Sequence, residues 1–195
     1  LDQVFGGMCR MSPDHYTDGT SVLRLLVHEI NRTFKDRLND LPDIAKFEGV
    51  LSSCFEKAFK EVKIKKEEVF AEPLIFTDFH KQPGGVPTYL GVESAEGIQE
   101  ILDGKLEEYN ESNTIMDLVL FRDAIAHVCR IARIIAQPRG NALLIGVGGS
   151  GKQSLSRLAT FICGYEVRQL NVSSRYGVEE FKEELRQMYI LAGQK

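Results

Sequence analysis

The chain has 195 residues, of which 43% are hydrophobic and 27% are charged, and its formal net charge is −4. This composition is typical of a globular protein rather than a disordered one. The net negative charge offers no overall attraction to nucleic acid or to an anionic membrane, so we expect neither as a partner. No stretch approaches the roughly 20 apolar residues that span a bilayer, and no signal peptide is visible.

Cysteine and histidine are sparse and scattered. The four cysteines are Cys9, Cys54, Cys129 and Cys163. They form no Cys-x-x-Cys pair and share no metal-ligand spacing with the four histidines. We therefore predict buried, reduced thiols and no metal site. The chain starts at Leu1 and stops at Lys195 without resembling a natural terminus at either end, and we expect it to be an internal piece of a longer protein.

Residues 20–38 predict an amphipathic helix, because apolar side chains recur at three- and four-residue steps. Its apolar face holds Leu23, Leu26, Val27, Ile30, Phe34 and Leu38. Its opposite, polar face holds Arg24, Glu29, Arg32, Lys35 and Asp36. Pro42 begins a second helix, whose apolar side runs from Ile44 to Val62 and includes Cys54 and Phe55. The two helices form a hairpin that has to bury its apolar stripe against another element.

A short apolar run at 74–76 is followed by Asp78, and so superficially resembles the acidic strand that holds magnesium in nucleotide hydrolases. That strand normally follows a phosphate-binding loop, whereas this run would precede one. We interpret it as a short structural strand. Residues 81–92 contain two prolines and three glycines and form the clearest linker. We expect the boundary between two units there.

Two further helices are predicted after the linker, one from Ala95 to Tyr109 and a longer one from Ile115 to Ala136. The inner face of the longer helix holds Val119, Ile125, Val128, Ala132 and Ile135. Pro138 and Gly140 end it. The periodicity then changes, because residues 141–147 are a nearly continuous apolar run, as expected of a buried parallel strand.

After residue 147 the predicted elements continue to alternate between helix and strand. The sequence predicts a helix at 152–164 closed by Gly164, a second strand at 165–173 and a helix at 177–193. The inner face of the last helix holds Val178, Phe181, Leu185 and Met188. The order strand, loop, helix, strand, helix indicates an α/β fold with a parallel sheet and right-handed crossovers. Two strands do not make a stable parallel sheet alone, so the expected sheet is incomplete.

The segment GVGGSGK between the first strand and its helix matches the phosphate-loop pattern Gly-x-x-x-x-Gly-Lys. Glycines let the backbone curl so that N–H groups point inward, and the helix adds its positive dipole end. The expected binding residues for ATP or ADP are Gly146, Val147, Gly148, Gly149, Ser150, Gly151, Lys152, Gln153 and Ser154. The alternative is a tightly packed glycine turn, which does not explain a lysine at a helix start, where the dipole disfavours a cation.

Gln153 stands where the pattern normally has Ser or Thr, whose hydroxyl contacts magnesium. A carboxamide can offer magnesium an oxygen, but its side chain is too long for the usual position without rearrangement. Ser154 is turned by about 100° relative to that position, since a helix has about 3.6 residues per turn. We therefore predict that nucleotide binds and that Mg²⁺-assisted hydrolysis is weakened or slow. No metal ligand is assigned.

Residues 116–159, which include this loop, resemble the start of the fourth AAA+ module of a dynein heavy chain. The GVGGSG run followed by Lys-Gln-Ser resembles the axonemal heavy chains, because cytoplasmic dynein keeps Thr after the lysine. Residues 23–38 resemble the lid helix that ends the third module. The resemblance implies a helical AAA+ lid in 1–82, a linker and connecting helix in 83–112, and the start of a P-loop AAA+ parallel-sheet domain with its Walker A loop in 113–195.

The resemblance implies a six-module ring that moves along microtubules in the axoneme of a cilium or flagellum, within the cytoplasmic cytoskeleton. The first module does the main hydrolysis, and the third and fourth are regulatory. The implied partners are neighbouring AAA+ modules, microtubules bound through other parts of the protein, and intermediate and light chains. The catalytic carboxylates and the arginine finger would lie outside this chain, so no catalytic residue is assigned and the segment alone is expected to be inactive.

The resemblance also assigns three residues outside the loop. Leu118 and Val119 match the stretch near the adenine, with plain helix core as the alternative. Arg24 matches a lid arginine that senses the third module's phosphate, with an exposed helix charge as the alternative.

Two other function classes stay open. A free-standing P-loop NTPase or kinase would want Ser or Thr after Lys152 and a complete sheet soon afterwards. A non-hydrolysing AAA+ interaction module would dock a neighbour through the hairpin at 20–62 and keep the loop only as a vestige.

Overall fold

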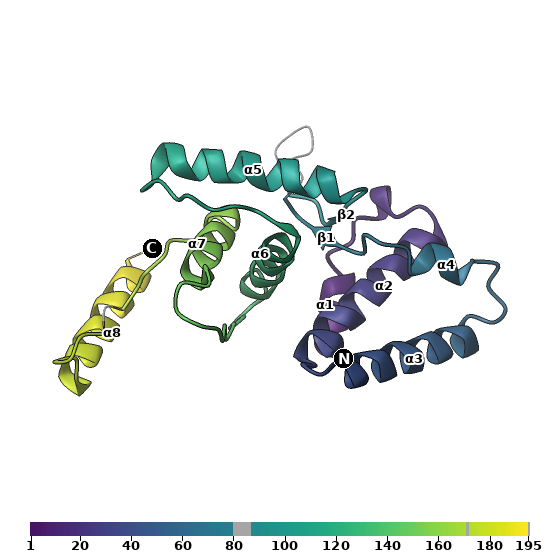
Figure 1. Ribbon diagram of the computed structural model, residues 1–195, viewed down its shortest axis with the longest axis horizontal. Helices are drawn as coiled ribbons and strands as arrows, with labels where there is room; N and C mark the ends of the chain where they lie inside the picture. Colours follow the sequence, from purple (N-terminus) through teal and green to yellow (C-terminus); the bar gives the residue numbers. More distant parts are fainter. Residues whose placement is uncertain (80–86, 171, 195) are drawn as a thin grey trace. The chain divides into compact units, whose positions relative to one another are not determined.

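The computed structural model describes residues 1–79, 87–170 and 172–194, and its regular structure is mostly helical (Figure 1). The helices are α1 (Asp2–Met8), α2 (Gly19–Phe34), α3 (Leu41–Ala58), α4 (Lys66–Val69), α5 (Ala95–Ser112), α6 (Arg122–Ile135), α7 (Lys152–Ile162) and α8 (Val178–Gly193). Short 3-10 turns occupy Pro13–His15 and Lys35–Arg37. No helix in these ranges is long and apolar enough to cross a membrane. The chain divides into two compact units, Leu1–Gly164 and Tyr165–Lys195.

The small sheet confirms the short strand that the sequence predicts near residue 76. Strand β1 (Phe76–Thr77) pairs antiparallel with β2 (Leu90–Gly91), with Phe76 opposite Gly91. The Phe76 ring lies 3.2 Å from where a Cβ on Gly91 would stand, so a larger residue there would push against the ring. Of the expected linker, residues 81–86 lie outside the described residues, and the remainder leads into β2.

Helix α2 begins close to the predicted start, but its buried face is wider than expected. Asp18 caps it by accepting a hydrogen bond from the Ser21 backbone N–H at 2.9 Å. Leu25 and Glu29 are fully buried, whereas Phe34, assigned to the apolar face, is 42% exposed. The helix packs against α1 and α4 on some sides and makes an ion pair to α6 on another. A helix contacted from several directions buries more than one stripe.

Helix α3 also departs from its predicted packing. It begins with Pro42 in its first turn, as expected, but it ends at Ala58, before Val62. Among the described residues of α3, Phe55 is the only one that is buried. Its ring contacts the rings of Phe59 and Phe70. The rest of the predicted apolar side is half-buried or exposed, because α4 and its flanks cover only one end of the helix.

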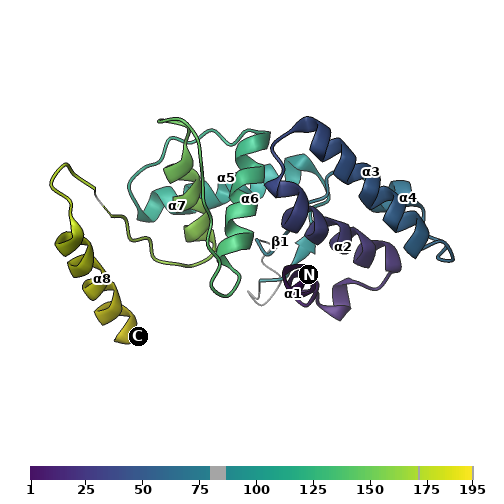
Figure 2. The ribbon, with the colours of Figure 1, turned by 90° about the horizontal axis from the view of Figure 1, so that it is seen from below.

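Two apolar cores form within the first unit. One surrounds α2 and contains Leu23, Leu25, Val27, Phe55, Val69, Leu74, Phe76 and Tyr89. The other lies among α5, α6 and α7, which pack on one another (Figure 2). Its fully buried members include Ile98, Leu102, Val128 and Leu158. This second core holds the helix that follows the glycine loop.

The predicted helix from Ile115 is wrong in its first two turns, because α6 begins at Arg122. The preceding segment is tied to α5 by Asn110, whose side chain accepts a hydrogen bond from the Met116 N–H at 2.7 Å and donates to the Met116 carbonyl at 3.3 Å. Val119, assigned to the inner face, is 75% exposed. The apolar residues before Arg122 are therefore spaced as in a helix but are not helical.

The predicted parallel strands at 141–147 and 165–173 are absent from the described residues, of which 171 is not one. Leu143, Ile145 and Val147 are all more than three-quarters exposed. A strand exists only through hydrogen bonds to a neighbouring strand, and no segment in the described ranges pairs with either run. Within the described residues the sheet is therefore the antiparallel pair of β1 and β2, and the parallel sheet predicted for residues 141–173 is not formed.

Helices α7 and α8 confirm the predicted helical segments at the end of the chain. Gly164 closes α7 with a φ of 71°, in the left-handed region that favours glycine. The predicted inner face of α8 is wrong for this structure, since no residue of α8 is buried. The four cysteines are free, as expected, but Cys9 and Cys54 are exposed rather than buried.

Candidate phosphate-binding loop

Residues 146–151 form a glycine-rich loop that leads directly into α7. Gly149 and Gly151 have φ values of 77° and 75°, which L side chains rarely adopt. Gly151 is the N-cap of α7 and offers no side chain to the first turn of the helix. The first N–H groups of a helix have no intrahelical partner, and the helix dipole is positive there. The loop therefore suits an anion.

Lys152 closes this loop on itself. Its Nζ donates hydrogen bonds to the carbonyl oxygens of Gly146 at 2.8 Å and Val147 at 2.6 Å, and to the Ser150 hydroxyl at 2.9 Å. The ammonium thus stands over the glycine bend. To bind a phosphate, Lys152 has to exchange these partners for phosphate oxygens.

The helix behind the loop is firmly anchored. Leu155, Leu158 and Ala159 are buried against α5 and α6. The rings of Tyr109 and Phe161 meet edge to face at 5.3 Å. The positive end of α7 is therefore carried by a packed element, while the loop itself is exposed.

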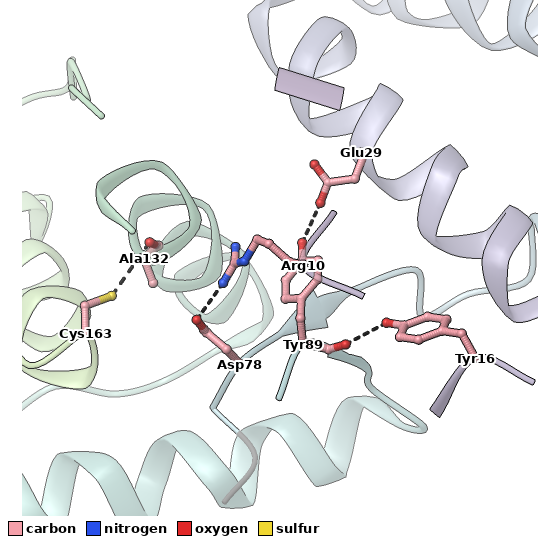
Figure 3. A network of polar contacts seen from close by, with 7 residues as sticks. All are labelled: Arg10, Tyr16, Glu29, Asp78, Tyr89, Ala132 and Cys163. Atoms are coloured by element: carbon pink, nitrogen blue, oxygen red, sulfur yellow. Dashed lines mark hydrogen bonds and ion pairs between the residues drawn. The ribbon is translucent and has the colours of Figure 1, made fainter. Parts of the chain in front are cut away.

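Cys163 adds a weak contact at the other end of α7. Its Sγ donates to the Ala132 carbonyl of α6 at 3.7 Å (Figure 3). Burial raises the pKa of the Cys163 thiol to about 11. This thiol is a packing group rather than a nucleophile.

The nine residues predicted from the pattern lie together in one loop and one helix turn. Gln153 is exposed and Ser154 is half-buried in the first turn of α7. No group of three or more His, Cys, Asp or Glu side chains suited to a metal ion occurs in the described part of the chain. The loop can offer backbone N–H groups and one ammonium to an anion.

Arg24, assigned by resemblance as a phosphate sensor, has a structural role here. Its guanidinium donates to the carbonyl oxygens of Glu68 and Ala71 at 2.8 Å and of Pro73 at 2.9 Å. These bonds tie α2 to the segment that leads from α4 to β1. Arg24 is therefore a cross-link between α2 and this segment rather than a free surface charge.

Leu118 and Val119, which the resemblance assigned near the adenine, differ in how exposed their side chains are. Leu118 packs against the second apolar core, whereas Val119 points to solvent. Neither belongs to a helix, so the plain helix-core alternative does not hold.

Sequence reasoning missed a buried polar network beside α2. Glu29 is fully buried and forms an ion pair with Arg133 of α6. It also accepts a hydrogen bond from the Tyr89 hydroxyl at 2.6 Å (Figure 3). Burial and the neighbouring Glu29 carboxylate raise the pKa of Tyr89, so that it stays a donor. The spacing of apolar residues placed Glu29 on a polar, solvent-facing side of α2. Because other elements contact α2 from several sides, that side is buried at Glu29.

The same network continues around Tyr89. The Arg10 guanidinium stacks on the Tyr89 ring at 4.1 Å and pairs with Asp78 at 2.6 Å (Figure 3). The Tyr16 hydroxyl donates to the Tyr89 carbonyl at 2.7 Å. Asp78, which in the sequence superficially resembled a magnesium ligand, is therefore the ion-pair partner of Arg10.

Comparison with known proteins adds to this geometry. Residues 116–195 match the family described as P-loop containing dynein motor region D4. The chain is 46% identical over 200 residues to the flagellar outer arm dynein beta chain of Chlamydomonas reinhardtii. It is 40% identical over 199 residues to human dynein axonemal heavy chain 2, and 40% identical over 195 residues to human dynein axonemal heavy chain 17.

These matches cover 99–100% of this chain but only 4% of each relative. The matched region includes the glycine loop, α7 and the buried network. The chain belongs to the axonemal dynein heavy chain family, as a segment that reaches into the D4 region of the motor.

Proposed function

We propose that residues 146–154 hold the phosphates of ATP or ADP in the fourth AAA+ module of an axonemal dynein heavy chain, and that this site regulates the motor. The observation that carries the proposal is the loop geometry. Two left-handed glycines and an uncapped helix start form a concave, positive site, and Lys152 lies over it. Residues 1–82 then belong to the lid of the preceding module, and 113–195 to the P-loop domain of the next.

The parent motor hydrolyses ATP and moves along microtubules in the axoneme of a cilium or flagellum. Its neighbours here are the adjoining AAA+ modules, and intermediate and light chains complete the complex. The residues of this segment act by binding and orienting nucleotide rather than by activating water. When bound, Mg²⁺ would neutralise phosphate charge, and Gln153 is the residue in the usual position for holding it.

Hydrogen exchange in the heavy chain tests nucleotide binding at this loop. ADP should slow amide exchange in residues 146–155, and Lys152→Ala should weaken that protection about tenfold or more, since a hydrogen bond to a charged group contributes about 1.5–3 kcal/mol. The matched control is Lys182→Ala, a lysine on the exposed α8. Protection that survives Lys152→Ala would contradict the proposal.

A second candidate function is a structural loop that Lys152 closes permanently. The three hydrogen bonds from Nζ to the loop favour it, because they satisfy the ammonium without a ligand. In that case ADP leaves exchange of residues 146–155 unchanged. Lys152→Ala then accelerates exchange of the loop whether or not nucleotide is present.

The substitution Gln153→Thr tests the proposed weakness of hydrolysis. Threonine restores the hydroxyl that contacts magnesium in this pattern. We expect Mg²⁺-dependent turnover at this module to rise, measured in a heavy chain whose first module is inactivated. Gln187→Thr, the same substitution at an exposed position of α8, is the control and should change turnover little. Rapid turnover in the unaltered chain, together with no effect of Gln153→Thr, would show that the proposal is wrong.

A further inference from the structure

A hollow of about 710 Å³ lies between α2, α6 and the chain that follows α6 as far as Leu144, and its lining includes no residue of the glycine loop. Five arginines line it: Arg32, Arg37, Arg130, Arg133 and Arg139. Asp36 is the acidic residue in its lining, 3.2 Å from the Arg32 guanidinium and 3.5 Å from that of Arg130. Glu29 neutralises Arg133 from behind. The two carboxylates thus pair with three of the five guanidinium groups, and the arginines carry more positive charge than these carboxylates neutralise.

Several buried donors in this hollow have no hydrogen-bond partner among the described residues. They are the Nε atoms of Arg32 and Arg133 and the Oγ1 atom of Thr33; the Nε atom of Arg130 also makes no hydrogen bond, although it lies 3.5 Å from the Asp36 carboxylate. Arg133 and Thr33 are less than one-tenth exposed. Buried polar atoms are nearly always hydrogen-bonded, so a group of unpartnered donors around one hollow calls for an acceptor.

The electrostatics of the arginines point the same way. Burial lowers the pKa of Arg32, and the neighbouring Arg130 and Arg133 lower it further, although Asp36 opposes them. An anion among these groups would remove that repulsion. Guanidinium groups match the geometry of phosphate and carboxylate oxygens, and several can share one oxyanion.

The backbone that lines one part of the hollow makes a tight turn after α6. Gly140 approaches α6 so closely that a Cβ there would lie 1.7 Å from the Ile134 carbonyl oxygen. Arg139 has a φ of 57°, a conformation uncommon for a residue with a side chain. This tight turn carries Arg139 to the rim of the hollow.

We propose that this hollow is a binding site for a small oxyanion, either free phosphate or the phosphate group of a small metabolite. The residues that line this site are different from those of the glycine loop. An anion held there links α2, which belongs to the lid, to α6, which precedes the loop. It would therefore stabilise the contact between the two parts.

Hydrogen exchange with inorganic phosphate as the probe tests this site in the heavy chain. Nucleotide sites are first filled with ADP, and ionic strength is held constant with chloride. Phosphate should slow exchange in α2 and α6, with Arg130→Gln and Arg139→Gln each weakening phosphate binding about tenfold. The control Arg122→Gln lies on the same helix α6 outside the hollow and should leave binding unchanged. Glucose 6-phosphate in place of phosphate distinguishes a metabolite from the free ion.

Absence of protection by either probe in the unaltered chain would overturn the proposal, whatever the variants do. Protection that persists in both arginine variants would also overturn it. A high-resolution map of the heavy chain in phosphate provides an independent measurement. Tetrahedral density among the arginines would support the site. Density for water alone, or for a carboxylate side chain from elsewhere in the heavy chain, would contradict the proposal. The variant Lys152→Ala should leave phosphate protection intact, which separates this site from the proposed nucleotide site.

Discussion

Glu29 lies where no part of its side chain reaches solvent. A buried carboxylate is costly unless a charge and hydrogen bonds compensate it, and here Arg133 and the Tyr89 hydroxyl do so. Arg133 comes from α6, 104 residues further along the chain. This ion pair therefore joins α2 to α6 and helps to fix how the two helices meet.

Removing one charge of this pair should be far more destabilising than removing a surface charge. For Glu29→Gln we expect the free energy of unfolding to fall by about 3–5 kcal/mol, because Arg133 is left buried without its counter-charge. The control Glu48→Gln breaks the more exposed pair with Lys35 and should cost at most about 1 kcal/mol. Urea unfolding of the 195-residue chain measures both. Equal costs would contradict this account of the pair.

His28 should make the fold sensitive to acid. Burial lowers its pKa to about 3, and its Nδ1 donates to the Leu74 carbonyl at 3.0 Å. Between pH 6.5 and about 3 the unfolded chain binds a proton that the native chain does not, so stability falls as pH falls. His28→Asn keeps a donor for Leu74 and should remove up to about 1.4 kcal/mol per pH unit of that slope.

Unfolding free energies measured between pH 6.5 and 4 check this prediction. The control variant is His15→Asn, at an exposed position, and its slope of unfolding free energy against pH is compared with that of His28→Asn. An unchanged slope in His28→Asn would show that His28 does not carry the effect.

The four thiols should differ in reactivity. Cys9 and Cys54 are exposed, whereas burial raises the pKa of Cys129 to about 12 and of Cys163 to about 11. Since the thiolate is the nucleophile, we expect iodoacetamide at pH 8 to modify Cys9 and Cys54 first. Mass spectrometry of the digested native chain measures the order, and urea should abolish it. Early modification of Cys129 in the native chain would contradict the described packing.

The glycine loop was predictable at the residue scale because its signal is local. Seven consecutive residues fix the spacing from Gly146 to Lys152, and the bend needs only glycine backbone at Gly149 and Gly151. Glu29 was not predictable, because its burial depends on Tyr89 and Arg133, which no local pattern connects to it. The same holds for Arg24, whose partners lie 44 to 49 residues away.

Helices were predicted better than strands at the element scale. A helix satisfies its backbone within one segment, so α2, α3, α5, α7 and α8 were found close to their bounds. A strand needs a neighbour, so residues 141–147 and the described residues of 165–173 kept their strand-like composition without becoming strands. The first turns of the predicted helix before Arg122 were lost to the Asn110 side chain, which holds Met116 by both backbone groups.

The packing of α7 should depend on its buried leucine. Leu158 is fully buried among α5, α6 and α7, so Leu158→Ala should lower the free energy of unfolding by about 2–5 kcal/mol. The control Leu143→Ala alters a side chain that is 87% exposed and should cost under about 0.5 kcal/mol. Chemical denaturation of the chain compares the two. A large cost for Leu143 would mean that the 141–147 segment is packed after all.

The two units of the whole molecule differ in what supports them. The first unit holds both apolar cores, whereas α8 in the second unit buries none of its residues. Isolated helices of this length are marginal in water, because most helical stability comes from packing. We therefore expect the amides of α8 to exchange with solvent far faster than those of α6 and α7 in the 195-residue chain. Hydrogen exchange followed by mass spectrometry measures this, and equal protection would contradict it.

The sequence by itself determined the helical segments, the short strand near residue 76, the glycine loop and the family, because these follow from local spacing and from runs of matching residues. The tertiary structure alone decided which faces are buried, that Glu29 pairs with Arg133, and that five arginines surround one hollow. Those features arise where residues distant in the chain meet, and the free energy of a charge or an apolar side chain depends on that meeting rather than on its neighbours in sequence.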